Sequence, residues 1–210
     1  SSLDKATIGS DKVKVIPLGI DFSDSHDKRK IPDDETIIFT GNMNYQPNIE
    51  AVLWFVSKCW PALKNRLPNV KLIIAGANPI KAIRSLSIND TAITVTGRVP
   101  SISDIIRTAK VAIAPMQSGS GMQYKILEAM AVGVPVVASR IGLGDLKAKP
   151  NIDILIANTQ EELISSILNI LKNNSLNVSI GLSGEKYAYK HHSELEMNKK
   201  FLDQVKSVLI

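Results

Sequence analysis

The chain has 210 residues, of which 44% are hydrophobic and 21% are charged, and its formal net charge is +5. This length suits one well-formed domain and excludes two of full size, and the composition is typical of a soluble globular protein. The lysines are scattered, without a basic stripe interleaved with aromatic residues, so we expect no nucleic-acid partner. A mildly basic surface remains compatible with an anionic ligand or with peripheral association with the cytoplasmic membrane face.

Cys59 is the only cysteine, which excludes a disulfide framework and a thiolate zinc cluster. Its neighbours Trp54 and Trp60 indicate an apolar helix face, so we expect a buried, inert thiol and two core tryptophans. A lone cysteine favours a reducing, cytoplasmic location. No apolar run approaches the roughly 18 residues of a membrane span, and no signal peptide is evident. The start at Ser1 without methionine indicates a piece of a longer protein.

Short β-rich segments alternate with helical patterns along the chain. Continuous apolar runs such as Leu72–Ala75 indicate strands covered by helices on both faces, as in a parallel sheet. The expected strands are Val13–Leu18, Thr36–Thr40, Val70–Ala75, Ala92–Val95, Val111–Ala114, Val134–Ala138 and Ile152–Ile156.

The expected helices start and stop at residues that favour helix ends. Pro47 suits a first helical turn, and Pro61 predicts a break near Trp60. Ser101 is a suitable cap, and Gly133 is a suitable C-terminal glycine. Beyond the helix that begins at Pro47, the expected helices are Ser101–Thr108, Gly121–Val132, Thr159–Lys172, Ser175–Lys190 and Ser193–Leu209.

This order predicts an α/β fold with a Rossmann-like, doubly wound parallel sheet and a helical C-terminal tail. We assign residues 1–190 to the domain and residues 191–210 to the tail, whose His191 and His192 we expect at the surface. Ligands of such sheets bind where the carboxyl ends of strands lead into helices.

Two strand-to-helix junctions are candidates for such a site. Gly41 follows the strand Thr36–Thr40 and permits close approach of a phosphate to the backbone before a helix start, but this loop taken alone is more typical of a common turn punctuated by Asn and Pro. The second junction, Gln117–Met122, has two glycines and two serines before a helix, a pattern of backbone amides suited to a diphosphate.

Lys125 and Glu128 lie one turn apart in the helix that follows the second junction. A carboxylate beside a nucleotide can accept two hydrogen bonds from a ribose diol, and an ammonium can neutralise a diphosphate. The spacing alone also fits an ordinary solvated helix pair, so both interpretations stay open here.

The stretch Gly119–Ser139, GSGMQYKILEAMAVGVPVVAS, resembles the signature of the family-4 (group 1) glycosyltransferases. Five further segments resemble the family in the same order, namely Val15–Asp21, Ile37–Gly41, Pro68–Gly76, Ile93–Val99 and Ala109–Pro115, so that the similarity runs from about Val13 to Lys172. The resemblance implies a two-domain GT-B enzyme, of which this chain is the C-terminal, donor-binding half-domain.

The resemblance also implies roles for particular residues. Glu128 corresponds to the second glutamate of the family's Glu-x7-Glu motif, which holds the donor ribose, and we expect Lys125 and Glu128 to be catalytic. The remaining expected donor-binding residues lie in the glycine loops, the segment beside the base and the helix start: Gly41, Asn42, Asn44, Gly97, Arg98, Val99, Ser118, Gly119, Ser120, Gly121, Met122 and Ile126.

The chain departs from the usual family pattern at two charged positions. Ser120 stands where the first glutamate of the motif falls, and Asn42 stands where many members have an arginine. The loop instead resembles a variant subgroup with G-x-M-x-Y-x-P-N after this strand. Lys125 is our first candidate for the displaced positive charge, and Arg98 is the second.

The expected function is metal-independent, retaining transfer of a sugar, of the hexosyltransferase type, from a UDP- or GDP-sugar to a hydroxyl acceptor in polysaccharide biosynthesis. No Asp-x-Asp motif is present, and we expect no metal or cofactor. The tail would dock on an N-terminal acceptor domain, and the isolated domain would be inactive. The alternatives are a non-catalytic nucleotide-sugar-binding subunit, which replacement of Lys125 in the full-length protein would distinguish, and a GT-B nucleotide-sugar epimerase.

Overall fold

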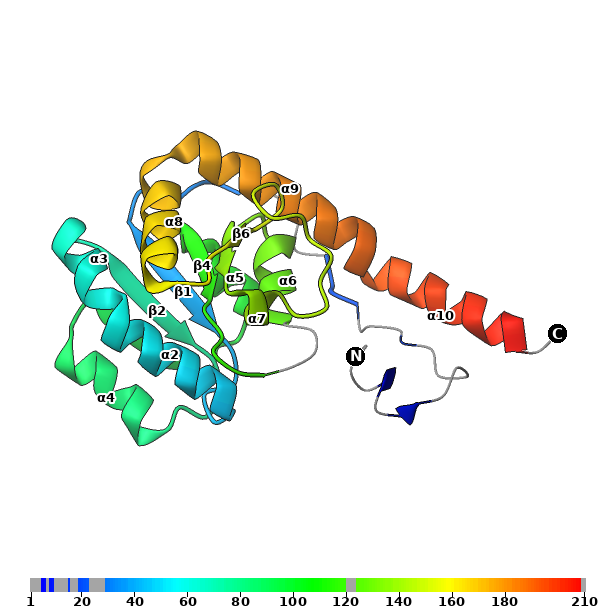
Figure 1. The fold of residues 1–210 in the computed structure, drawn as a ribbon, viewed down its shortest axis with the longest axis horizontal. Helices are drawn as coiled ribbons and strands as arrows, with labels where there is room; N and C mark the ends of the chain where they lie inside the picture. The colour runs from blue at the N-terminus through cyan, green and yellow to red at the C-terminus, as the bar shows by residue number, and fades with distance from the viewer. Residues whose placement is uncertain are drawn as a thin grey trace.

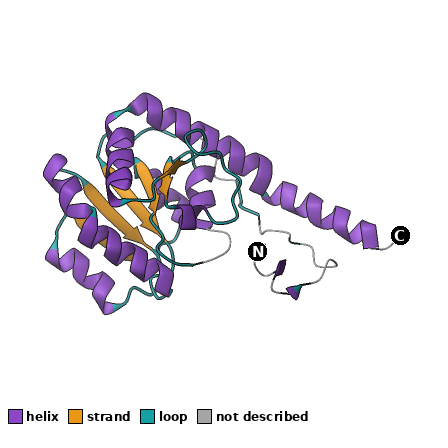
Figure 2. Ribbon diagram, viewed as in Figure 1, coloured by secondary structure: helices purple, strands orange, loops and turns teal. Residues whose placement is uncertain are grey.

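Six parallel strands form one sheet in the order β3-β2-β1-β4-β5-β6 (Figures 1 and 2). The structure is a computed structural model, and it describes residues 5–6, 8–9, 15, 19–22, 29–119 and 124–208. The strands are β1 (Thr36–Thr40), β2 (Lys71–Ala75), β3 (Ile93–Gly97), β4 (Val111–Ala114), β5 (Val136–Ala138) and β6 (Leu155–Ile156). The reversal of strand order between β1 and β4 makes the sheet doubly wound, as the sequence predicted.

Helices cover both faces of this sheet (Figure 2). They are α2 (Gln46–Lys58), α3 (Trp60–Arg66), α4 (Lys81–Asn89), α5 (Ile102–Arg107), α6 (Tyr124–Ala131), α7 (Arg140–Leu143), α8 (Gln160–Lys172), α9 (Asn174–His192) and α10 (Glu194–Val208). Successive strand residues point to opposite faces, so Ile37 and Phe39 pack with α2, α3, α4 and α8, whereas Ile38 packs with α5 and α6. The central strands are therefore apolar on both sides, which explains their continuous hydrophobic runs.

Most of the predicted helix ends are confirmed. Cys59 separates α2 from α3, and Ser101 caps α5 by accepting a hydrogen bond from the Asp104 backbone N–H at 3.1 Å. Thr159 forms a capping box with Glu162 at the start of α8, and Gly133 has a φ of 70° after α6.

The predicted burial of Cys59 and Trp60 is confirmed, whereas that of Trp54 is corrected. Cys59 and Trp60 are buried, and burial raises the pKa of the Cys59 thiol to about 12, as suits an inert core thiol. Trp54 is only partly buried, because α2 turns Ala51, Val52 and Phe55 into the core instead.

Several element boundaries differ from the sequence prediction. The last strand is only Leu155–Ile156, because residues 150–154 form a tight turn in which Asn151 has a φ of 62°. Helices α4 and α7 were not predicted, α7 being a single short turn capped by Ser139. Apart from Val15, which is not in a strand, the predicted strand Val13–Leu18 lies outside the described residues.

The long helix α9 crosses α6, and α10 extends beyond the body of the domain (Figure 1). Helix α9 continues past the predicted boundary at residue 190 and ends at His192, where the His192 carbonyl accepts a 2.8 Å hydrogen bond from the Ile20 N–H. The prediction that His192 lies at the surface is wrong, because it packs against Tyr187 and is 8% exposed; His191 is exposed, as predicted. None of the described helices is long and apolar enough to span a membrane.

Candidate functional site

The loops at the carboxyl edge of the sheet are joined by backbone hydrogen bonds. The N–H of Gly41, after β1, donates to the Ala75 carbonyl at 3.0 Å, and the N–H of Gly76, after β2, donates to the Gly97 carbonyl at 3.1 Å. On the other side of β1, the Ser139 N–H after β5 donates to the Ala114 carbonyl at the end of β4 at 3.1 Å. These bonds join the ends of β1, β2 and β3 on one side and the ends of β4 and β5 on the other, and the pairing of β1 with β4 brings the two groups together as one rim.

Glycine is required where this rim is most tightly packed. A Cβ atom at Gly76 would lie 1.9 Å from the Gly41 carbonyl oxygen, and one at Gly41 would lie 2.6 Å from Nδ2 of Asn48. Both glycines also have positive φ angles, of 143° and 151°. The backbone after β1 can therefore approach a ligand without a side chain in between.

Asn48 connects the loop after β1 to helix α6. This side chain is 4% exposed, its Nδ2 donates to the Asn42 carbonyl at 3.0 Å, and its Oδ1 accepts from Nζ of Lys125 at 2.8 Å. Lys125 thus lies between the two loops that the sequence singled out. A buried amide suits this position, because it can accept from the lysine through Oδ1 while it donates to the loop through Nδ2.

Lys125 is an ammonium in an apolar setting. Its Nζ lies 5.3 Å from the centroid of the Phe39 ring and 3.6 Å from Sδ of Met116. Burial lowers the pKa of Lys125 to about 8, although the nearby Glu128 carboxylate favours its charged form. At neutral pH the lysine is charged and poised to release its proton close to physiological pH.

Glu128 is partly buried, one turn after Lys125 on α6. Burial raises the pKa of Glu128, and the Lys125 ammonium opposes that rise. The two residues are therefore a partly desolvated pair beside the rim, and the interpretation as a fully solvated surface pair does not hold.

Glu50 is a site residue that the sequence prediction missed. From α2 its Oε2 accepts a hydrogen bond from Oγ of Ser118 at 2.6 Å, and its Oε1 accepts one from Nε2 of Gln46 at 3.0 Å. These bonds, with Ser118 the stronger cause, hold the pKa of Glu50 below its usual value, so it is ionised at neutral pH. The Gln46–Glu50 spacing was visible as one helical turn, but no local signal indicated contact with residue 118.

The other predicted donor-binding residues are spread along the rim. Asn42 and Asn44 are exposed in the loop after β1, where Oδ1 of Asn42 accepts from the Asn44 N–H at 3.1 Å. Gly119 is exposed with a φ of 110°. Ser120, Gly121 and Met122 lie outside the described residues.

The remaining predicted residues are those of the segment 97–99, which the resemblance places beside the base, and Ile126. Gly97, with a φ of 67°, ends β3 and is followed by exposed Arg98 and partly buried Val99. Arg98 follows β3, whereas Lys125 lies in the helix after β4, and strands β2 and β1 separate β3 from β4 in the sheet. Lys125, and not Arg98, is therefore the cation that contacts Asn48. The Ile126 side chain is fully buried in the core, so only its backbone could reach a ligand.

This arrangement suits a ligand that combines negative charge with hydroxyl groups. An ammonium can stabilise a phosphate, and the two carboxylates can accept hydrogen bonds from hydroxyls. Within the described part of the chain, no three His, Cys, Asp or Glu side chains are grouped as a metal site.

The sheet order and the glycine rim place the chain among Rossmann-like domains of the GT-B architecture. The family model described as "Glycosyl transferases group 1" matches residues 34–173, and the chain belongs to this family.

Comparisons with individual proteins agree with this placement. A mutant of S. aureus TarM, crystallised with fondaparinux, α-GlcNAc-glycerol and UDP, has a TM-score of 0.75 at 19% identity over 96% of this chain and 41% of TarM. The C-terminal domain of LpcC, a group 1 glycosyl transferase from Francisella tularensis, has a TM-score of 0.66 at 14% identity over 83% of this chain and 99% of that domain.

A curated relative matches by sequence. It is the "uncharacterized 44.6 kDa protein in cps region" of Klebsiella pneumoniae, which is 28% identical over 144 residues, 65% of this chain and 37% of the relative. The chain therefore spans well under half the length of this relative and of TarM.

Proposed function

We propose that this domain binds the nucleotide-sugar donor of a glycosyltransferase, a UDP- or GDP-sugar, at the rim described above. The observation that carries the proposal is the 2.8 Å contact between Lys125 and Asn48, which sets one ammonium between the glycine loops after β1 and β4. The diphosphate would meet this ammonium and the loop amides. Glu128, one turn further along α6, would accept hydrogen bonds from the ribose.

The proposed reaction is metal-independent, retaining transfer of a hexosyl group to a hydroxyl acceptor. Lys125 and the helix-terminal amides would stabilise the leaving diphosphate without a metal or cofactor. The UDP in the TarM structure supports a uridine donor. The position of the Klebsiella relative in a cps region supports polysaccharide biosynthesis.

A partner domain would supply the acceptor, so we expect the 210-residue chain to bind donor without turnover. Helix α10 carries the exposed apolar side chains Leu195, Phe201, Leu202 and Val205, which would dock on that domain. The buried, reduced thiol of Cys59 supports action in the cytoplasm.

Calorimetric titration of the chain with UDP, GDP and ADP tests the donor site. We expect Glu128→Gln to weaken binding of the preferred nucleotide by about ten- to a hundredfold, because charge-assisted hydrogen bonds to the ribose are lost. The same change at the exposed Glu161 of α8 is the matched control and should leave affinity within about twofold. Equal affinities for wild type and Glu128→Gln would contradict the proposed site.

Glu50 would supply the sugar contact that Ser120 lacks. Its carboxylate is held against Ser118, two residues before the position of the family's first glutamate. An ionised carboxylate repels a diphosphate but accepts hydrogen bonds from sugar hydroxyls, so its partner in the donor would be the transferred sugar.

Comparison of UDP with UDP-glucose and UDP-N-acetylglucosamine tests this role. Glu50→Gln should leave UDP affinity within about twofold but weaken the better UDP-sugar by about tenfold, because charged acceptors make stronger hydrogen bonds. Ser118→Ala serves as the control for loop position. If Glu50→Gln weakens UDP and the UDP-sugar equally, Glu50 only positions the loop.

A further inference from the structure

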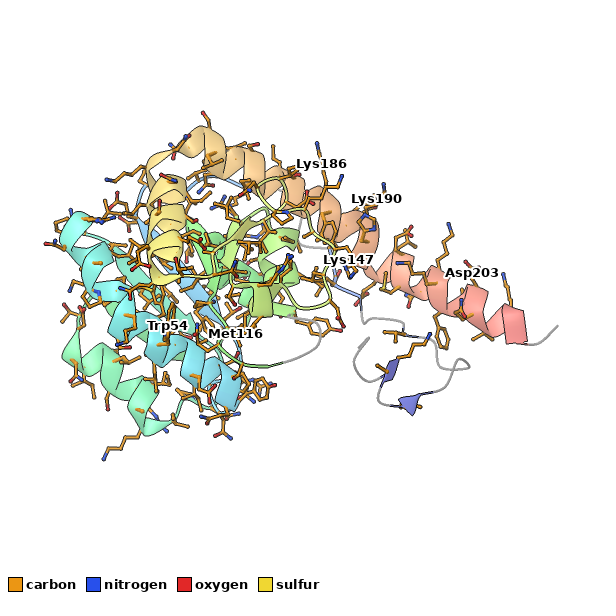
Figure 3. All side chains as sticks on the ribbon, in the orientation of Figure 1. Trp54, Met116, Lys147, Lys186, Lys190 and Asp203 are labelled. Carbon is orange, nitrogen blue, oxygen red and sulfur yellow. The ribbon has the colours of Figure 1, made fainter. Side chains whose placement is uncertain are left out.

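A hollow lies apart from the rim proposed to bind the nucleotide. It is a cavity of about 590 Å³ between the segment that joins α7 to β6, the C-terminal half of α9 and the first half of α10. Figure 3 shows Lys147, Lys186 and Lys190 on this side of the molecule, well separated from Met116, which lies beside Lys125 in the rim. Such a volume is within the range of small-ligand sites.

The walls of this cavity are strongly basic. Five lysines from three separate segments line it, namely Lys147, Lys149, Lys186, Lys190 and Lys200, against two aspartates. One of these aspartates, Asp153, is 8% exposed and already accepts hydrogen bonds from the Lys149 N–H at 2.8 Å and from Oγ of Ser183 at 2.7 Å. That carboxylate is already hydrogen-bonded within the wall of the cavity and is not available to bind a cation.

The basic segments are held together by polar contacts at the back of the cavity. The Tyr187 hydroxyl accepts from the Lys147 N–H at 2.8 Å and lies 3.3 Å from Nε2 of His192, which ties the loop to the end of α9. Nδ1 of His192 is buried and has no hydrogen-bond partner within the described part of the chain. Burial, followed by the charges of Lys200 and His191, lowers the pKa of His192 to about 4, so the wall contributes a neutral imidazole.

We propose that this cavity binds a phosphate-bearing anion, whether a soluble phosphate compound or an anionic lipid head group. Ammonium groups are point-charge partners for phosphate oxygens, and lysines that line one cavity from three segments can contact a phosphate from more sides than one helix face could. The cavity does not include any residue proposed above for donor binding, so its occupancy is independent of the nucleotide site.

Two probes identify the ligand source. In the first experiment, inorganic pyrophosphate is titrated calorimetrically into the 210-residue chain with the rim saturated by UDP. In the second, the same chain is sedimented with vesicles made either of phosphatidylglycerol and phosphatidylcholine or of phosphatidylcholine alone. Pyrophosphate binding assigns a soluble ligand, and sedimentation only with the phosphatidylglycerol vesicles assigns a head group; either result supports the proposal.

A pair of charge-removing variants locates the binding. Lys186→Gln with Lys190→Gln should reduce affinity by about tenfold or more, while UDP affinity and melting temperature stay unchanged. Lys81→Gln with Lys172→Gln removes the same charge from exposed positions on α4 and α8 and should change affinity less than twofold. The proposal is overturned if neither probe binds, or if both double variants weaken binding equally, because the attraction would then be a property of the net charge.

Discussion

The most informative residue in the rim is Lys125. The sequence placed it one turn from Glu128 and left open whether the pair was solvated or functional. The structure shows that the lysine is bonded to Asn48, 77 positions away, whose buried amide accepts from it, so the pair is not fully solvated. A lysine bonded to a buried amide, close to an aromatic ring and with a pKa near 8, can respond strongly to an arriving anion.

Lys125 should make UDP binding depend on pH. Its pKa in the free protein is about 8, and a bound diphosphate would raise it, so protonation and binding favour one another. We expect UDP affinity to fall above pH 8 by up to about tenfold per pH unit, and Lys125→Met to abolish that part of the dependence. Calorimetry at pH 7, 8 and 9 measures it, with Lys81→Met as the control.

The ionisation of UDP itself affects binding to the wild type, Lys125→Met and Lys81→Met proteins alike. The difference between the pH profiles of the wild type and Lys125→Met therefore reports Lys125 alone. Parallel pH profiles for wild type and Lys125→Met would show that the ammonium does not face the diphosphate.

The lowered pKa of Lys125 also makes folding stability depend on pH, with a defined sign. Because the folded pKa lies below the unfolded one, the unfolded chain binds more protons between about pH 8 and 10.5, and this lysine favours stability as pH rises through that range.

At the scale of elements, α9 is held against the turn between α6 and β5 by close backbone contact. A Cβ atom at Gly181 would lie 2.3 Å from the Gly133 carbonyl oxygen, in the turn between α6 and β5. The guanidinium of Arg29 donates to the same carbonyl at 3.1 Å and to Oδ1 of Asn177 at 2.9 Å. Helix α9 therefore approaches the turn closely enough that the side chain at position 181 must be absent.

Gly181→Ala should destabilise the domain, although alanine is the better helix former. The propensity gain of about 1 kcal/mol is outweighed by displacement of the helix or the turn, which we expect to lower the free energy of unfolding by about 2 kcal/mol net. Urea unfolding followed by circular dichroism measures the difference. Ser179→Ala, at an exposed position on α9, is the control and should be neutral or slightly stabilising. A Gly181→Ala protein as stable as wild type would show that the contact can relax freely.

At the scale of the whole molecule, the fold separates two polar surfaces. The rim at the carboxyl ends of the strands carries Lys125, Glu128 and Glu50, whereas the basic cavity is built where α9 and α10 meet the segment after α7. Helix α10 projects from the domain with its apolar residues exposed (Figure 1). We therefore expect the donor, a second phosphate-bearing ligand and the acceptor domain to use different surfaces.

The sequence by itself determined the features that depend on near neighbours along the chain. Apolar runs predicted five of the six strands to within about two residues, and Ser101, Thr159 and Gly133 marked helix ends, because side-chain alternation and capping act over a single turn. The long motif around Glu128 predicted the family correctly, since its residues form one continuous stretch of the chain.

Only the tertiary structure decided which distant residues meet. Glu50 reaches Ser118 across 68 positions, His192 is buried although it ends a polar helix, and the cavity lysines come from three separate segments. These pairings follow from how helices cross the two faces of a twisted sheet, which depends on the packing of the whole core. No local pattern contains that information, so the fold could be predicted from the sequence while these long-range polar contacts could not.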